Sequence, residues 1–571
     1  MHDLVIRNAN IYDGLGNPPV FGDLAVSNGR IDAIGQHNGG SRTAGQALGP
    51  GKTEHDAEGQ ALTPGIIDLH THYDAQLTWD PYARPSIEQG VSTVVIGNCG
   101  FTIAPCRERD RDITLRNLTH VEGMSLDALR AGVVWNFETY PQYLDALAAK
   151  GSVPNVCSFV GHSSVRTYVL GDEASERAAT PGEVEQMREL VVGAMRAGAC
   201  GFATSTLEQH NGENGIPMPS RLADEHEMFE LTGALGEVGK GVFMLTKGMT
   251  TTVPWLEEIA RRNRRPVMIA AMLIDPNDPD RVANEVEQIG SARARGRELW
   301  GQVGPVPLTM EFCLRHPYPL EAFMAWRPAM EVPDCEAFLD VLASSDFRAA
   351  VKAEARTTGV PNRFSYHQFE HMRFTEVTRP EHEIVLGQII GDLARAAGKD
   401  PFDWLLDFAA DGGLDAMIDC KMLNVDEGRV QAMLDHDHTA VALSDAGAHL
   451  SFLCDAGFGL HLYGHWVRER GSMPLERAVQ RITSAAADVY RIKDRGRLVP
   501  GAWADLALFD PQTVGRGEKR RVNDLPAGAA RVEMPAVGVK GVWVNGERAV
   551  DENGAIEGCA QSGQLLRDFA D

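Results

Sequence analysis

The middle of the chain alternates between short apolar segments and amphipathic helices, and this alternation restricts the fold more than any other feature. Residues 157–160 and 242–245 are apolar and strand-like. Between them, Thr180, Pro181 and Glu183 are typical of a helix start: a capping residue, a proline at the first helical position and the glutamate of a capping box. Further signals of the same kinds are a helix start at Asp224 and strands at 266–270 and 439–443.

Repeated strand–helix units produce parallel strands covered by helices. We predict a (β/α)8 TIM-like barrel rather than an open sheet, because no glycine-rich dinucleotide fingerprint or phosphate loop follows the first strand. We expect the barrel to span residues 61–494, with an insertion at about 311–435 whose helices are harder to place.

Both ends of the chain are typical of β structure. Apolar alternation around Asn28 and Gly29 predicts a hairpin, since a type I′ turn needs positive φ at both central positions. Residues 504–509 and 537–544 predict strands near the other end. We therefore expect one small composite β-sandwich domain, from residues 1–60 plus 495–571, although two separate β caps would give the same pattern.

Composition excludes several classes of function. The 571 residues carry 54 basic and 79 acidic side chains, a formal net charge of −25, which disfavours nucleic acid and anionic membranes as partners. No long apolar run predicts a membrane span and no signal peptide is recognisable. The 9 cysteines do not cluster in tight pairs, so we expect reduced thiols and a cytoplasmic location.

The run Pro64 to His72 carries the strongest chemical signal. An apolar strand precedes His70 and His72, and residues two apart on a strand point the same way. Both imidazoles can then reach one metal ion at about 2.0–2.1 Å, as zinc requires. Two hydrogen-bonded histidines at a strand end would give the same pattern, but the Pro-Gly turn and the apolar strand favour a metal.

Five segments, in order along nearly the whole chain, resemble segments of the amidohydrolase superfamily. Within that superfamily they are most similar to the N-acyl-D-amino-acid deacylases (D-aminoacylases). The resemblance implies a metal-dependent hydrolase barrel with a β domain. The five segments are PGIIDLHTH at 64–72 together with the N-terminal strand pair, the second-strand segment 90–101, the third-strand motif 161–166, the last-strand motif 443–449, and the return to the β domain at 494–507.

The resemblance implies specific roles. His70 and His72 match the two ligands of the first strand. Cys99 matches a cysteine that is a metal ligand where other relatives use a carboxylated lysine; a small core residue is the alternative. Asp445 matches the aspartate that binds metal and acts as general base, and its alternative is a helix cap after a strand. The implied mechanism is metal-assisted hydrolysis with Asp445 as the catalytic residue.

The chain also departs from the family. The next metal histidine is absent from the strand that ends at Thr246 and Lys247, and the strand at 266–272 has none. We therefore expect one zinc ion per chain rather than two, held by His70, His72, Asp445 and Cys99. Lys247 has three interpretations: a carboxylated metal ligand, an ammonium that binds a substrate carboxylate, or a surface lysine at a strand end.

Three further residues are candidates for substrate binding. His162 and Arg166 follow the strand at 157–160, and Arg166 is suited to a bidentate carboxylate pair or to a structural salt bridge. His449 lies four residues after Asp445 and is a candidate on the metal or oxyanion side. The remaining histidines considered, which we expect to face solvent, are His210, His367 and His371.

The sequence thus predicts a hydrolase that cleaves the amide C–N bond of a small N-acylated amino acid, a bond other than a peptide bond. One alternative is hydrolysis of another linear, cyclic or xenobiotic amide. Another is a barrel that has lost catalysis, which missing histidines would accompany. The sequence leaves the oligomeric state open and is compatible with a homo-oligomer.

Overall fold

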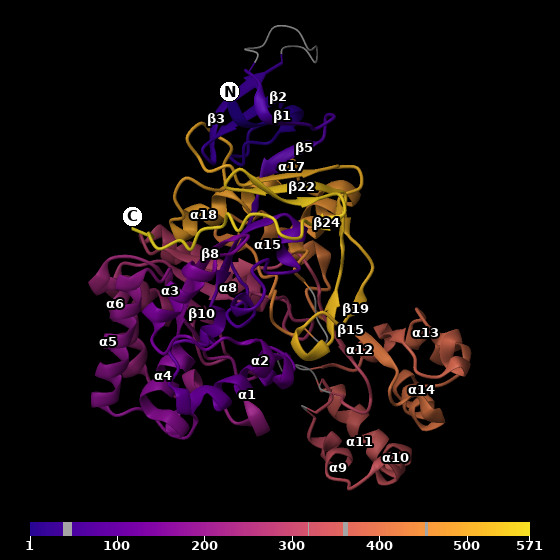
Figure 1. Ribbon diagram of the computed structural model, residues 1–571. Helices are drawn as coiled ribbons and strands as arrows, with labels where there is room; N and C mark the ends of the chain where they lie inside the picture. Colours follow the sequence, from indigo (N-terminus) through magenta and orange to yellow (C-terminus); the bar gives the residue numbers. More distant parts are fainter. Residues whose placement is uncertain (38–47, 318, 322, 358–363, 451–454, 571) are drawn as a thin grey trace. The chain divides into compact units, whose positions relative to one another are not determined.

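The computed structural model describes the chain except for residues 38–47, 318, 322, 358–363, 451–454 and 571. Residues 38–51, whose many glycines predict a flexible surface loop, lie mostly outside the described residues. The central element is an eight-stranded parallel sheet (Figure 1). Its strands are β6 (Ile66–Asp68), β7 (Val91–Ile96), β8 (Asn155–Gly161), β9 (Gly201–Ser205), β10 (Val242–Thr246), β11 (Val267–Ala270), β12 (Leu299–Val303) and β16 (Thr439–Val441).

Hydrogen bonds just beyond the first and last strands bring the two edges of this sheet together. The backbone N–H of His72 donates to the carbonyl of Ala446 (2.7 Å), and that of Asp445 donates to the carbonyl of His70 (3.2 Å). Thr71 and Ala446 form a parallel bridge. The sheet is therefore a closed (β/α)8 barrel, as predicted, and its closure places the segments after β6 and β16 side by side.

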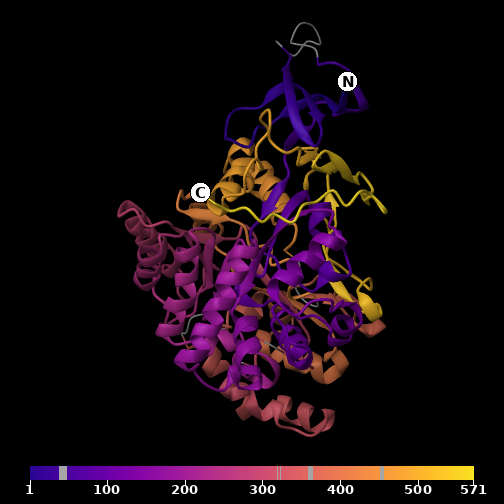
Figure 2. The same cartoon turned by 60° about the vertical axis from the view of Figure 1, so that its left-hand side comes forward.

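Helices connect successive strands and lie outside them (Figures 1 and 2). The predicted capping box is present: the Thr180 side chain accepts from the backbone N–H of Glu183, with Pro181 at the first position. Asp224 caps the next helix in the same way. The helices around the barrel are α1 (Arg111–Val121), α2 (Leu126–Gly132), α3 (Tyr140–Lys150), α4 (His162–Leu170), α5 (Pro181–Ala197), α6 (Glu225–Val238), α7 (Val253–Asn263), α8 (Arg281–Ala294), α16 (Phe458–His461), α17 (Leu475–Arg481) and α18 (Ser484–Tyr490).

Strands from both chain ends form one mixed sheet. Asn28 and Gly29 have φ values of 53° and 72°, which give the predicted hairpin turn. The central pairing joins the two ends of the chain: β5 runs antiparallel to β17. This confirms a β domain built from both ends. Its strands are β1 (His2–Ile11), β2 (Val20–Ser27), β3 (Arg30–Gln36), β4 (Gly51–Asp56), β5 (Ala61–Pro64), β17 (Leu506–Phe509), β22 (Val539–Val544), β23 (Glu547–Asp551) and β24 (Gly554–Ala555). Two short strand pairs lie between β17 and β22: β18 (Gly515–Arg516) with β21 (Ala536–Val537), and β19 (Arg520–Val522) with β20 (Arg531–Glu533).

Residues 273–284 and 306–433 form a second compact unit. It has its own apolar core, which includes the fully buried Trp326 and Phe369. A three-stranded sheet in the order β13–β15–β14 packs with short helices. Its elements are β13 (Leu308–Phe312), β14 (Arg373–Glu376), β15 (Met417–Leu423), α9 (Arg327–Met330), α10 (Cys335–Ala343), α11 (Ser345–Ala355), α12 (Gln368–His371), α13 (Ile390–Ala396) and α14 (Pro401–Phe408); α15 (Glu427–Asp435) follows and extends past the end of this unit.

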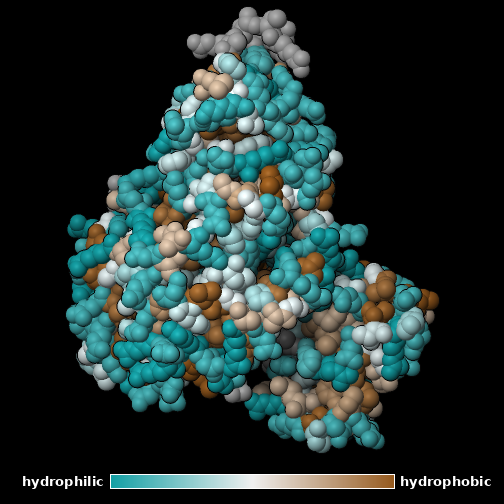
Figure 3. Space-filling model, in the orientation of Figure 1, coloured by the Kyte–Doolittle hydropathy of each residue, from teal (hydrophilic) through white to brown (hydrophobic). Residues whose placement is uncertain are grey.

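The face shown in Figure 3 is dominated by hydrophilic residues. Apolar residues on it are mostly scattered among polar ones. Within the described part of the chain, no helix has both the length and the apolar character needed to cross a membrane.

Candidate metal centre

Two histidines just beyond β6 form the base of the candidate site. Asp68 ends β6, and the chain continues through His70 and His72. Both side chains are buried, with exposed fractions of 1% for His70 and 5% for His72. Their ring centroids lie 5.2 Å apart. The two imidazoles therefore occupy one buried region at the carboxyl end of the barrel strands, where barrel enzymes carry their active sites.

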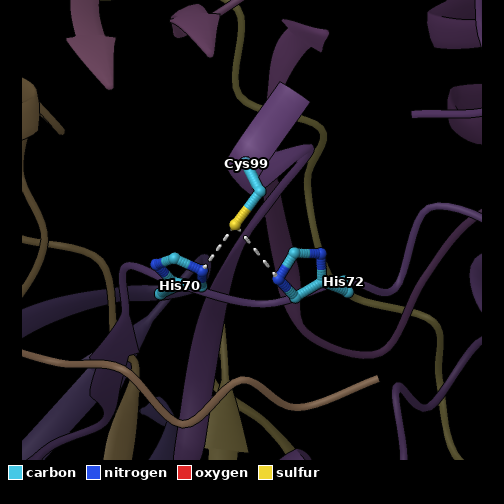
Figure 4. Close-up of side chains that lie close together, drawn as sticks. All are labelled: His70, His72 and Cys99. Atoms are coloured by element: carbon cyan, nitrogen blue, oxygen red, sulfur yellow. Dashed lines mark hydrogen bonds between the residues drawn. The ribbon is translucent and has the colours of Figure 1, made fainter. Parts of the chain in front are cut away.

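Cys99 reaches the histidines from a turn after β7. Gly97 has a φ of 83°, a conformation that glycine adopts without strain, and Cys99 itself has a φ of 56°. The Cys99 sulfur lies 3.5 Å from Nε2 of His70 and 4.0 Å from Nε2 of His72. Figure 4 shows the sulfur directed between the two rings.

Asp445 approaches from the segment after β16. Leu443 and Asp445 have φ values of 74° and 53°, so the backbone turns sharply here. Oδ1 of Asp445 lies 3.4 Å from Nε2 of His70 and 3.0 Å from Nε2 of His72. Its other oxygen, Oδ2, lies 3.4 Å from Nε2 of His449. One carboxylate oxygen thus joins the group of imidazole and thiol atoms, and the other faces away from it toward His449.

These donor atoms fit a single metal ion. The sulfur and Oδ1 each lie 3.0 to 4.0 Å from the two Nε2 atoms. Ligands about 2.1 Å from a tetrahedral ion are about 3.4 Å apart, so the set matches zinc-like coordination. Two imidazoles, a thiol and a carboxylate are also the ligand types that zinc binds in proteins. Among the described residues, His70, His72 and Cys99 form a group whose ligand atoms lie close enough together to hold a metal ion.

Burial and charge set the protonation of these groups in opposite ways. Burial lowers the pKa of His70 to about 4, so its imidazole is neutral, the form in which it binds metal. Burial acts the same way on His72, but the charge of Glu122 and a hydrogen bond to Asp445 outweigh it and raise its pKa well above the usual value. Burial raises the pKa of the Cys99 thiol. His72 in turn helps to hold the pKa of Asp445 well below its usual value, so each of the two residues favours the charged form of the other.

Comparison with known protein families decides the assignment. The model of the amidohydrolase family matches residues 53–550. The chain belongs to the amidohydrolase family. The match covers the barrel, the second compact unit and the part of the β domain from β5 to β23, and it leaves out β1 to β3.

Individual relatives are similar over nearly their whole length. The N-acyl-D-aspartate deacylase of Alcaligenes xylosoxydans xylosoxydans is 29% identical over 573 residues, 99% of this chain and 95% of that protein. The D-aminoacylase of the same organism is 29% identical over 559 residues, 95% of this chain and 93% of that protein. A solved structure of N-acyl-D-glutamate deacylase from Bordetella bronchiseptica contains zinc and a phosphonate inhibitor that mimics the tetrahedral intermediate. It is 26% identical, covers 99% of this chain and 100% of its own, and has a TM-score of 0.66. The predicted resemblance to N-acyl-D-amino-acid deacylases is confirmed.

This amidohydrolase has two site residues that the sequence motifs do not reveal. Oε1 of Gln302, at the end of β12, lies 2.6 Å from Nδ1 of His70. Oε1 of Glu122, which directly follows α1, lies 3.0 Å from Nδ1 of His72. The partners are 232 and 50 residues away in sequence, and neither lies in a motif. Gln302 lies on β12, a barrel strand that was not predicted from the sequence. No sequence feature points to Glu122.

A hydroxyl stands where the family histidine is absent from β10. Oγ1 of Thr246 lies 3.1 Å from the Cys99 sulfur. The end of β11 carries Ala270 and then Met272, both buried, so no imidazole arises there either. The chain therefore offers the donor set of one metal position and a neutral alcohol beside it.

Lys247 has an environment that none of its three interpretations anticipated. Its ammonium forms a 2.9 Å ion pair with Glu285 of α8, and the two side chains are only 8% and 12% exposed. The ammonium compensates this nearly buried carboxylate. The contact favours a structural role for Lys247 over a metal ligand or a binding group for a substrate anion.

His162 and Arg166 also differ from the substrate-binding roles considered for them. Both belong to α4 and are fully buried. The Glu227 carboxylate accepts from Nε2 of His162 at 2.7 Å through Oε1, and from the Arg166 guanidinium through Oε2. Nδ1 of His162 is 2.7 Å from the Thr204 hydroxyl. Of the two roles weighed for Arg166, the structure favours the structural salt bridge, because its carboxylate partner is already Glu227.

The other histidines occupy three kinds of environment. His449 contacts Asp445 and is partly exposed, so it borders the donor group. His210 packs its ring against Phe101 with centroids 4.9 Å apart, and its Nδ1 lies 2.6 Å from the Ser205 hydroxyl. Burial and the nearby His449 lower the pKa of His210 to about 3, and the residue is partly exposed rather than fully solvent-facing. The two histidines of the second compact unit, which are exposed as expected, are His367 and His371.

Proposed function

We propose that this amidohydrolase removes the acyl group from N-acyl-D-amino acids. The observation that carries the proposal is the convergence of His70, His72, Cys99 and Asp445 at one end of the barrel. Relatives that match nearly the whole chain are an N-acyl-D-aspartate deacylase and a D-aminoacylase. The same donor set argues against a barrel that has lost catalysis, because a relic has no reason to keep four ligand residues together.

We propose one zinc ion per chain as the cofactor. His70, His72, Cys99 and Oδ1 of Asp445 would hold it, and Thr246 supplies no imidazole for a second position. When bound, zinc supplies Lewis-acid polarisation of the amide carbonyl and lowers the pKa of water toward about 7. Zinc is also the metal in the solved N-acyl-D-glutamate deacylase.

Asp445 is the proposed general base. Its Oδ2 points away from the donor group and accepts a proton from the water that attacks the acyl carbon. The C–N bond then breaks, and Asp445 gives this proton to the leaving amine nitrogen, so that a carboxylate and an amine result. His449, 3.4 Å from Oδ2, orients this oxygen and lies where it can stabilise negative charge on the substrate.

A specific observation supports a second candidate function. The cations that seemed suited to a substrate carboxylate, Arg166 and Lys247, are both committed to glutamates. Hydrolysis of an amide without an α-carboxylate is therefore the alternative function. Both candidates use a small-molecule substrate, which fits the net charge of −25 better than a nucleic acid would. With the free thiols found at the described cysteines, we keep a cytoplasmic location as part of the proposal.

A substrate panel tests this function. Protein purified without chelator is incubated with N-acetyl-D-amino acids that have acidic, neutral and apolar side chains, with their L enantiomers, and with matched amides that lack the carboxylate. We expect release of free amine from the D series only. Release from the carboxylate-free amides alone would establish the alternative, and no release from any substrate would contradict both.

A further inference from the structure

The two ligand histidines are supported differently on the nitrogen that faces away from the donor group. Nδ1 of His70 meets the neutral amide oxygen of Gln302, whereas Nδ1 of His72 meets the carboxylate of Glu122. Both support residues are buried, with Gln302 fully inaccessible and Glu122 4% exposed. Neither Gln302 nor Glu122 lies in one of the sequence motifs.

The carboxylate of Glu122 needs an explanation. A buried carboxylate is destabilising unless a cation or several hydrogen bonds compensate it. Among the ion pairs of the described residues, the partner of Glu122 is His72, with Oε1 3.0 Å from Nδ1. Glu122 directly follows α1. Its backbone N–H donates to the carbonyl of Leu118 and so caps the last turn of that helix. The fold thus places one buried acid against one ligand histidine.

The two nitrogens of His72 face opposite partners. Nδ1 faces Glu122, while Nε2 faces the Asp445 carboxylate at 3.0 Å and the Cys99 sulfur at 4.0 Å. With a metal bound, the ion pair at Nδ1 would keep the remaining proton on that nitrogen and leave the Nε2 lone pair for the metal. A carboxylate acceptor also makes the imidazole a stronger ligand than an amide acceptor does.

We propose that Glu122 is a positioning residue for the metal centre, which fixes the tautomer and ring orientation of His72 and makes His72 a stronger metal ligand than His70. The inference rests on the proposed metal-dependent function. Gln302 orients His70 in the same way without adding charge. The chain therefore carries an unequal pair of supports, a carboxylate on one ligand and an amide on the other.

Zinc affinity of the metal-free protein, measured by competition with a chromophoric chelator, tests the inference without relying on activity. Glu122→Gln keeps the size of the side chain and removes its charge, and we expect it to weaken zinc binding by about 10–100-fold. Glu122→Asp keeps the charge and should recover part of the loss. Glu237→Gln, an exposed glutamate on the outside of the barrel, is the control and should leave affinity unchanged.

A reciprocal change separates positioning from general damage. Gln302→Glu places a second carboxylate behind a ligand, so we expect tighter zinc binding, which a merely disrupted site would not show. If Glu122→Gln fails to fold, this variant still decides the question. Equal affinities for the wild type and for a folded Glu122→Gln protein, or no gain for Gln302→Glu, would overturn the positioning role alone. A wild type that binds no zinc would overturn the proposed function together with it.

Discussion

The hydroxyl of Thr246 lies 3.1 Å from the sulfur of Cys99, at the end of β10 where the family pattern places a metal histidine. An alcohol at this position donates or accepts a hydrogen bond but is a weak zinc ligand beside imidazole and thiolate. Cys99 therefore has His70 and His72 on one side and a neutral partner on the other. This contact is the structural basis for expecting one metal ion.

If Cys99 is a metal ligand, its removal weakens zinc binding more than the loss of a residue that only orients a ligand. We expect Cys99→Ala to weaken zinc binding by more than the about 10–100-fold typical of residues that only orient a ligand. In cobalt-substituted protein, the sulfur-to-metal charge-transfer absorption should disappear as well. Cys106→Ala removes another buried thiol, one outside the metal-binding group, and should change neither property. Unchanged zinc affinity in Cys99→Ala would make Cys99 a packing residue.

Replacing Asp445 by Asn separates catalysis from folding. The variant keeps a side chain of the same shape but loses the base, so we expect kcat to fall by at least about 10²–10⁴-fold. Circular dichroism and the unfolding midpoint should stay near those of the wild type. Asp437→Asn, at an exposed position, serves as the matched control. An active Asp445→Asn protein would contradict the proposed mechanism.

The local part of the site was predictable because its signals are local. Asn28 and Gly29 specify their turn through positive φ, and Thr180 and Glu183 specify a helix start through reciprocal hydrogen bonds. His70 and His72 share a side because of the two-residue period of an extended chain. These inferences need only neighbouring residues, and the closed barrel follows from repeating such units.

The contacts across the fold were not predictable in the same way. Glu227 lies 61 residues from Arg166, and only tertiary packing decides that this arginine pairs with a buried acid instead of a ligand. The same applies to Lys247 with Glu285, and to the supports Glu122 and Gln302. A charged side chain at a strand end has the same sequence pattern whether it binds substrate or pairs with an oppositely charged side chain on a neighbouring helix.

The buried Arg166–Glu227 pair should stabilise the fold without taking part in catalysis. Glu227→Gln leaves the Arg166 charge without a countercharge, so we expect a loss of about 3–5 kcal/mol in the free energy of unfolding. Urea denaturation measures this loss. Glu237→Gln, which breaks an exposed pair on the same helix, should lose no more than about 1 kcal/mol. A loss of kcat in folded Glu227→Gln protein, with an unchanged free energy of unfolding, would instead show that the Arg166–Glu227 pair takes part in catalysis.

Acid should destabilise the protein through His162. Burial lowers the pKa of His162 below its usual value, so the unfolded chain binds this proton more readily than the folded chain does. Stability from this residue is therefore complete above about pH 6.5 and falls as the pH drops toward the folded pKa, by at most about 1.4 kcal/mol per unit. Urea midpoints between pH 7.5 and 5.5 measure the effect. His162→Gln should show a shallower decline, and an identical decline would assign the effect to other groups.

The most direct test of the account is the zinc content per chain, measured by elemental analysis of protein purified without chelator. We predict about one zinc per chain, bound by His70, His72, Cys99 and Asp445. About two would contradict the single-ion centre and show that other groups replace the absent histidines. No zinc, and none recovered after zinc is added, would contradict the metal-dependent function itself.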